Sequence, residues 1–108
     1  MKILRLKPYL RAMERMGLDE AAMRTVELDI ALAPEAHPVI KGLKGVRKAR
    51  FALPGHGKRG GGRAIYYIAL QTSIYMMLAY PKNVAEDLSS DQRKRILDVI
   101  ESLKGDKL

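Results

Sequence analysis

Four cations lie where neighbouring extended segments would bring them together: Lys48, Arg50, Arg63 and Lys82. Lys48 and Arg50 share one face of a predicted strand, Arg63 begins the next strand, and Lys82 follows the third. Converging cations bind a phosphate and stabilise the negative charge that develops on it during phosphoryl transfer. Crowding also favours the neutral form of a lysine, so Lys48 or Lys82 could act as general base toward a ribose 2′-hydroxyl. The same four groups could equally bind phosphate without chemistry.

A glycine-rich loop, residues 54–62, joins the first two predicted strands and carries His56, Lys58 and Arg59. The two cations could reach along a nucleic-acid backbone, and His56 could act as an acid or base among them. A nucleotide-binding P-loop is excluded, because Arg59 stands where Ser or Thr would hold magnesium and a strand follows instead of a helix.

Two tyrosines are candidates for contact with RNA. Tyr67 alternates onto the face of Arg63 and could stack on a base, and Tyr80 could donate a proton near Lys82. Most tyrosines of this region are nevertheless expected in the core, and Tyr66 faces it by alternation.

The charge distribution singles out the middle of the chain. The net charge is +8 over 108 residues, yet no Asp or Glu occurs between Ala36 and Ala85. The cations of that stretch are Lys41, Lys44, Arg47, Lys48, Arg50, Lys58, Arg59, Arg63 and Lys82. A solvated face normally mixes both signs, so this stretch, Arg47 included, predicts a polyanionic partner, with nucleic acid favoured over an anionic membrane.

Several classes of protein are excluded. The chain has no cysteine, which removes disulfides, thiolate metal sites and a cysteine nucleophile and agrees with a cytoplasmic location. No apolar run approaches the roughly 20 residues of a membrane span. The acids Glu86 and Asp87 are adjacent and point apart, without a histidine cluster, so neither a metal nor another cofactor is expected.

The apolar spacing predicts helices at both ends of the chain. Residues 3–16 have the period of a helix that ends at Gly17, and Asp19 is a plausible N-cap for a second helix that ends before Pro34. Ser89 and Gln92 form a possible capping box for a last helix that closes at Gly105.

Between these helices the period changes to two. Residues 46–53, 63–70 and 74–80 read as three strands of an antiparallel meander, and the third is apolar on both faces and therefore central. The expected fold is a single α+β domain over residues 1–108, with an N-terminal helical hairpin, a β-meander and a C-terminal helix.

Three motifs in this order resemble the HigB-like branch of the RelE/ParE toxin superfamily, over residues 40–104. They are Gly-Leu-Lys-Gly-Val-Arg-Lys-Ala-Arg-Phe (42–51), Gly-Lys-Arg-Gly-Gly-Gly-Arg-Ala-Ile-Tyr-Tyr (57–67), and Leu-Ala-Tyr-Pro-Lys-Asn (78–83) followed by Glu-Asp-Leu (86–88). The resemblance implies the toxin half of a toxin–antitoxin pair, a microbial-RNase-like fold, and metal-independent cleavage of messenger RNA on the ribosome. It also implies a cognate antitoxin as protein partner.

Site roles follow from the same resemblance. Lys48 and Arg50 match basic strand residues that bind phosphate and abstract a proton, Arg63 matches the arginine that steadies the scissile phosphate, and Lys82 lies near the leaving group. RelE has a tyrosine soon after that last basic residue, where this chain has residues 86–88, so the general acid is not identified. Members also begin with a short strand before the hairpin, whereas the spacing here predicts helix from Ile3.

Two other functions remain open. A non-catalytic toxin of the ParE kind shares the fold and poisons a topoisomerase by protein contact. A plain nucleic-acid-binding module would bind with steep salt dependence and never turn over.

Overall fold

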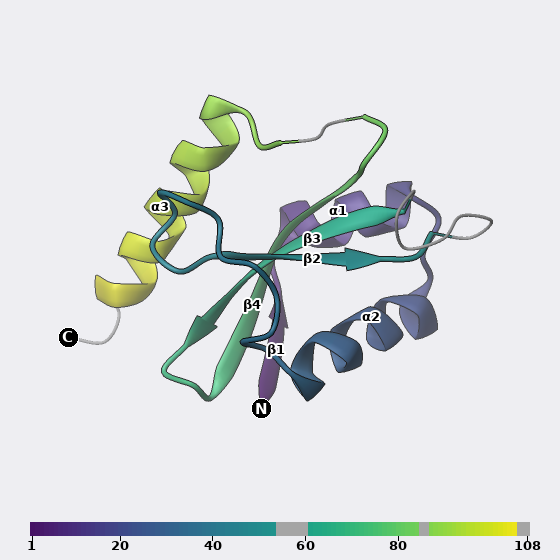
Figure 1. The fold of residues 1–108 in the computed structure, drawn as a ribbon, viewed down its shortest axis with the longest axis horizontal. Helices are drawn as coiled ribbons and strands as arrows, with labels where there is room; N and C mark the ends of the chain where they lie inside the picture. The colour runs from purple at the N-terminus through teal and green to yellow at the C-terminus, as the bar shows by residue number, and fades with distance from the viewer. Residues whose placement is uncertain (54–60, 85–86, 106–108) are drawn as a thin grey trace.

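The computed structural model describes residues 1–53, 61–84 and 87–105, and its elements follow one another in the order βααβββα (Figure 1). Their bounds are β1 Lys2–Arg5, α1 Lys7–Arg15, α2 Glu20–Leu32, β2 Arg47–Phe51, β3 Gly62–Ala69, β4 Ser73–Pro81 and α3 Ser90–Gly105. The fold class is α+β, as the sequence predicts.

The first strand corrects the prediction that helix begins at Ile3. Lys2–Arg5 form β1, which pairs in parallel with β4 from Ser73 to Met76. Pro8 explains why helix does not extend back, because proline is tolerated only in the first turn and clashes with the carbonyl four residues earlier. The helix therefore begins at Lys7, and the residues before it pair with residues of β4 that lie 71 positions later in the chain, as Lys2 does with Ser73.

The helix ends follow local signals. Gly17 has φ +88° and lies just after α1, in the left-handed region that favours glycine. Asp19 caps α2, since its Oδ1 accepts a hydrogen bond from the Ala22 N–H at 2.9 Å. Ser89 and Gln92 form the expected capping box, with the Gln92 N–H donating to Ser89 Oγ at 3.1 Å and the Ser89 N–H donating to Gln92 Oε1 at 2.9 Å.

The sheet has the strand order β1-β4-β3-β2, so β4 is central, as predicted. β2, β3 and β4 form the expected antiparallel meander. The turn between β3 and β4 comprises residues 70–72; Leu70 and Gln71 have φ of 55° and 60°, and the Thr72 N–H donates to the Ala69 carbonyl at 3.1 Å. The pairing of β3 with β4 is shifted by a β-bulge between Ile65 and Tyr66, where Ile65 pairs with Leu78 and Tyr66 with Met76.

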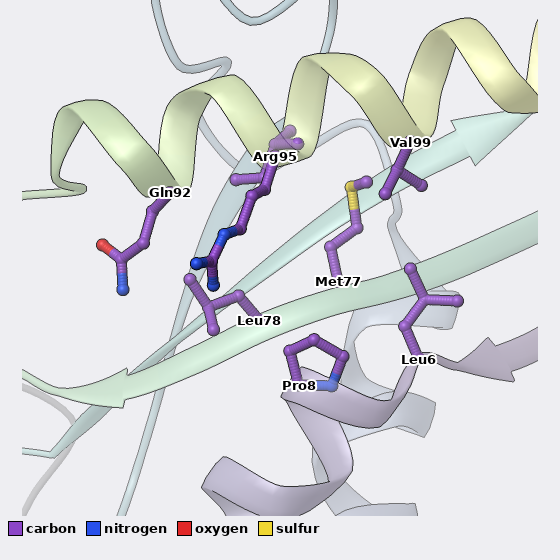
Figure 2. Close-up of a pocket in the computed structure, with 8 residues that line it drawn as sticks. Leu6, Pro8, Met77, Leu78, Gln92, Arg95 and Val99 are labelled. Carbon is purple, nitrogen blue, oxygen red and sulfur yellow. The ribbon is translucent and has the colours of Figure 1, made fainter.

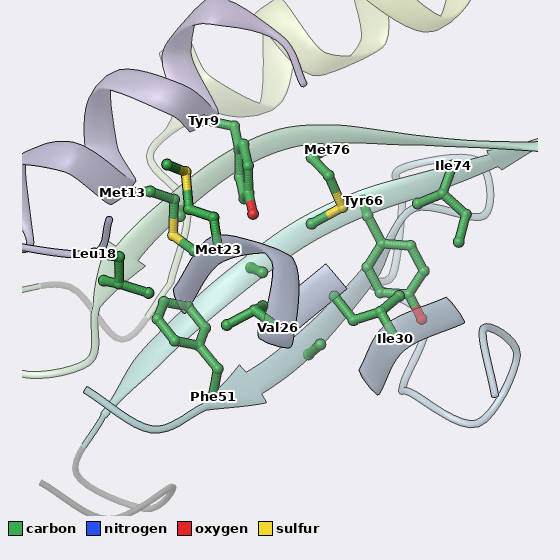
Figure 3. Packing of buried hydrophobic residues seen from close by; sticks show 13 residues of the cluster. Tyr9, Met13, Leu18, Met23, Val26, Ile30, Phe51, Tyr66, Ile74 and Met76 are labelled. Atoms are coloured by element: carbon green, nitrogen blue, oxygen red, sulfur yellow. The ribbon is translucent and has the colours of Figure 1, made fainter. Parts of the chain in front are cut away.

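Both faces of the sheet are covered. One face packs against the α1–α2 hairpin, in a core that includes Tyr9, Met13, Ile30, Phe51 and Tyr66 (Figure 3). The other face packs against α3 and the segment before β2, in a core of Leu43, Val46, Ile65, Met77, Tyr80, Leu88, Ile96 and Ile100. Figure 1 shows α3 and α2 on opposite sides of the sheet.

An ion pair between the partly exposed Arg5 and the buried Glu27 joins β1 to α2. Arg5 donates through Nε and Nη2 to the two carboxylate oxygens of Glu27, each at 2.8 Å, and the Tyr9 hydroxyl donates to Glu27 Oε2 at 2.8 Å. Glu27 is 4% exposed, so its charge is stable there only because these donors surround it. Burial and the hydrogen bond to Glu27 raise the pKa of Tyr9 far above its ordinary value.

Candidate phosphate-binding site

Three residues from three strands lie in one row across the sheet. Arg50 of β2 pairs with Arg63 of β3, and Arg63 pairs with Tyr80 of β4. Directly paired residues project from the same face of a sheet, so the three side chains are neighbours. Because Ala49 and Phe51 face the α1–α2 hairpin, Arg50 lies on the opposite face, the one that α3 covers. We call Arg50, Arg63 and Tyr80 the polar row.

The β-bulge places Tyr80 on the same face of the sheet as Arg50 and Arg63. Ile74 and Met76 face the hairpin core, and strict alternation would direct Leu78 and Tyr80 there too. Instead Met77 and Leu78 both lie toward α3, which reverses the alternation for the rest of β4. Tyr80 therefore lies on the α3 face and Ala79 on the hairpin face.

The Tyr80 hydroxyl is a buried polar group. Tyr80 is 7% exposed, and its oxygen makes no hydrogen bond with any described residue. Burial raises the pKa of this hydroxyl and Asp87 adds to the rise, whereas the positive charges of Arg63 and Arg93 oppose it. The hydroxyl is protonated at neutral pH, as a tyrosine with its ordinary pKa also is, and it can donate a hydrogen bond; the raised pKa makes it a weaker acid than an exposed tyrosine. An unsatisfied buried hydroxyl costs about 1–3 kcal/mol and calls for a reason.

Arg63 is held at the centre of the row by its neighbours. Its side chain is 6% exposed, and Nη1 donates to the Gly62 carbonyl at 3.0 Å. Gly62 is required beside it, because a Cβ at that position would lie 2.2 Å from Phe51 Cζ. The Phe51 ring thus occupies the space that any other residue at position 62 would need.

Two charged residues near Tyr80 were not among the predicted site residues. Arg93, in the first turns of α3, donates to the Lys41 carbonyl at 3.1 Å and lies 3.7 Å from Asp87 Oδ1 through Nη2. Both charges act on the Tyr80 hydroxyl. The capping box at Ser89 could have placed Arg93 at the start of α3, but no signal in the sequence shows which face of the sheet that end approaches.

The remaining predicted cations are distributed unevenly. Lys48 is half-buried on the face of Arg50 and two residues from it, whereas Lys82 is exposed just beyond β4, where its N–H donates to the Gly61 carbonyl. Arg47 lies on the opposite face and donates to the carbonyls of Glu35 and His37, at 3.0 and 2.7 Å. The structure therefore brings Lys48 next to the polar row and directs Arg47 away from it.

The other predicted contacts with RNA are more distant or cannot be placed. Tyr67 is half-buried and packs against the α3 core. It pairs with Tyr75 of β4 and lies two residues beyond Ile65 in β3. Tyr66 is fully buried in the hairpin core, as predicted. His56, Lys58 and Arg59 lie outside the described residues.

The groups at this site that could take part in a reaction are cationic side chains and the Tyr80 hydroxyl. Within residues 1–53, 61–84 and 87–105, no three His, Cys, Asp or Glu side chains come together as metal ligands would. None of the helices in this part of the chain combines the length and apolar character needed to cross a membrane. Arg50 is exposed and Lys48 half-buried on the face of the polar row, so both can meet an anion from solvent, whereas Arg63 and Tyr80 are buried.

Comparison with solved structures identifies the fold. The E. coli toxin RelE, solved as a double arginine-to-alanine mutant in the free state, superposes with a TM-score of 0.52 at 13% identity, covering 79% of this chain and 86% of RelE. A conserved hypothetical protein from Helicobacter pylori gives a TM-score of 0.54 at 20% identity, covering 77% of this chain and 96% of that protein. No family model matches the sequence. The chain has the RelE fold, and at these identities the likeness concerns the fold alone.

Proposed function

We propose that this protein is the toxin of a toxin–antitoxin pair, of the HigB-like kind, and that it cleaves messenger RNA on the ribosome without a metal. The observation that carries the proposal is the polar row: two arginines, and a tyrosine hydroxyl with no hydrogen-bond partner among the described residues, on one face of a RelE-fold sheet. The acid-free stretch from Ala36 to Ala85, which contains the row, gives the surface its affinity for a polyanion.

The proposed reaction is an internal transfer within RNA. Lys48 in its neutral form takes the proton from a ribose 2′-hydroxyl, and the 2′-oxygen forms a bond to the adjacent phosphorus as the bond to the 5′-oxygen breaks. The leaving 5′-oxygen takes a proton from Lys82 or Tyr80, and the products are a 2′,3′-cyclic phosphate and a free 5′-hydroxyl. Arg50 and Arg63 stabilise the charge on the non-bridging oxygens, where each donor contributes about a hundredfold or more in rate.

The test is cleavage of a defined messenger RNA in the presence of EDTA, with and without ribosomes. We expect ribosome-dependent cuts by the intact protein and a loss of about a hundredfold or more in Arg63→Ala. Because Arg63 is buried, the exposed Arg50→Ala serves as a second variant that does not endanger folding. The matched control is Arg24→Ala, on the outer face of α2, which should cleave like the intact protein.

One observation favours a second candidate, a nucleic-acid-binding module. Arg63 and Tyr80 are at most 7% exposed, so a bound RNA would first meet Arg50, Lys48 and Lys82. A module of this kind would bind RNA with a steep salt dependence and leave it intact. RNA binding without cleavage, whether or not ribosomes are present, would reject the nuclease and support this alternative. If the protein neither binds nor cleaves RNA, the ParE-like, non-catalytic toxin is left.

A further inference from the structure

The edge of β4 is open along its second half. β1 pairs with β4 only as far as Met76, and from Met77 to Pro81 no strand among the described residues borders β4 on that side. An unpaired strand edge presents backbone donors and acceptors that can pair with another chain. This edge lies between the start of α1 and α3.

The backbone groups at this edge can be assigned from the pairing on the other side. The Lys82 N–H donates to Gly61 on the β3 side, and successive residues of a strand direct their polar groups to opposite sides. Ala79 therefore directs its N–H and its carbonyl toward the open edge. Pro81 has no N–H, and its carbonyl already accepts a hydrogen bond from the Val84 N–H at 3.1 Å. The N–H and the carbonyl of Ala79 are therefore the groups that an incoming strand can pair with.

Two adjoining hollows flank the edge and share Pro8, Leu78 and Gln92. The first, of about 170 Å³, lies between β4 and α3 and is lined by apolar side chains that include Leu6, Met77, Ile96 and Val99 (Figure 2). The second, of about 460 Å³, lies between α1 and residues 78–81. Apolar hollows on either side of a strand edge suit the alternating side chains of an added strand.

The rim of this groove is basic. Arg11 and Arg15 of α1 line one hollow and Arg95 of α3 lines the other, and all three are exposed. None of them forms a salt bridge with a described residue, and no described Asp or Glu lines either hollow. The charge that complements this rim is negative.

We propose that the groove binds an extended acidic peptide of a partner protein, which adds as a strand along β4. RNA fits the groove less well, because the lining is largely apolar and Tyr80, the one aromatic ring among the described lining residues, is buried and cannot stack on a base. The proposal does not require nuclease activity. If the chain is a toxin, the antitoxin is the protein expected to carry such a segment.

The experiment uses the full chain and a fluorescein-labelled peptide, Glu-Val-Glu-Val-Glu-Val-Glu, measured by fluorescence anisotropy. A second peptide has lysine in place of every glutamate, and a third has the same composition with its glutamates and valines in two blocks. The charge-reversed variant Arg11→Glu/Arg15→Glu is compared with Lys2→Glu/Lys104→Glu, which makes the same change in net charge away from the groove. Thermal melts establish that both variants fold.

We expect saturable binding of the alternating acidic peptide and weaker binding of the other two. Arg11→Glu/Arg15→Glu should weaken it about tenfold or more, and the matched variant should change it far less. Amide hydrogen exchange gives a second readout, in which the Ala79 N–H gains protection on binding while that of Ala64, between β2 and β4, does not change.

Three results would overturn the proposal: no binding at about 1 mM peptide, equal loss in both variants, or no protection at Ala79. If oligouridine competes with the peptide and the groove reversal abolishes its binding, the groove is an RNA surface instead. The nuclease assay is independent, so the failure of one proposal does not imply the failure of the other.

Discussion

The Phe51 ring lies against the backbone of Gly62, its cross-strand partner, so closely that a Cβ on residue 62 would be 2.2 Å from the ring's Cζ. Phe51 is 4% exposed and packs in the hairpin core, so the ring cannot simply swing into solvent. Gly62 precedes Arg63 and accepts a hydrogen bond from its guanidinium. This contact therefore couples the packing of the core to the position of the central arginine of the polar row.

Gly62→Ala should destabilise the protein by about 1–3 kcal/mol, because the added methyl group overpacks the site and displaces the ring. Urea unfolding followed by circular dichroism measures the change. Phe51→Leu in the same background leaves room for the methyl group and should recover part of the loss. Full additivity of the two substitutions would contradict the contact.

Glu27→Gln should be strongly destabilising, by about 3 kcal/mol, because it removes the charge that pairs with Arg5 in a buried setting. Glu20→Gln is the matched control, since Glu20 also contacts Arg5 but lies on the surface. This substitution should lower the free energy of unfolding much less. Equal effects of the two substitutions on the free energy of unfolding would show that burial does not govern this network.

Two substitutions in the turn between β3 and β4 should make the protein more stable. Leu70 and Gln71 both have positive φ, which disfavours branched and long side chains and favours Asn-Gly. Leu70 is also 68% exposed, so its replacement removes little packing. Leu70→Asn/Gln71→Gly should raise stability by about 1 kcal/mol. A lower melting temperature in the double variant would argue against this turn geometry.

Tyr80→Phe should leave stability unchanged or increase it by about 1 kcal/mol, because it removes a buried hydroxyl that has no hydrogen-bond partner among the described residues. Tyr66→Phe is the contrasting control, since its hydroxyl donates to the Pro34 carbonyl at 2.5 Å and its loss should destabilise. If the Tyr80 hydroxyl serves the proposed reaction, Tyr80→Phe will cleave RNA more slowly although it folds at least as well. A clear loss of stability would mean that this hydroxyl has a structural partner.

Alkaline pH should unfold the protein through its buried tyrosines. Burial raises the pKa of Tyr66 to about 12, and the charge of Arg47 lowers it only in part. Because the folded pKa lies above the ordinary value of 10, this contribution to stability is complete below pH 10 and is lost as the pH rises toward 12. The melting temperature should fall over that range, and less steeply in Tyr66→Phe. A pH-independent melting temperature from 10 to 12 would refute the assignment.

Local signals in the sequence were sufficient for much of the fold. The capping residues Asp19 and Ser89 are read from short-range spacing, and each makes the hydrogen bonds expected of it. The alternation along β2 placed Lys48 and Arg50 on one face, and that along β3 placed Tyr67 on the face of Arg63, because side chains of a regular strand change sides at every residue. These features depend on neighbours within a few positions, which is why no partner in space had to be known.

The features of the fold and the site that local signals did not predict depend on tertiary contacts. The four residues of β1 have no strand signal that outweighs the helical spacing after them, and they become a strand because β4 offers an edge. The bulge at Met77 and Leu78 reverses the alternation of β4, so Tyr80 joins the arginines. The approach of α3 then adds Arg93 and Asp87 to its surroundings. Local patterns thus predicted three helices, with the start of the first corrected, as well as the meander and the cationic face of β2. The pairing of distant strands and the approach of α3 brought Arg63, Tyr80 and Arg93 together, because such contacts depend on packing between residues far apart in the chain.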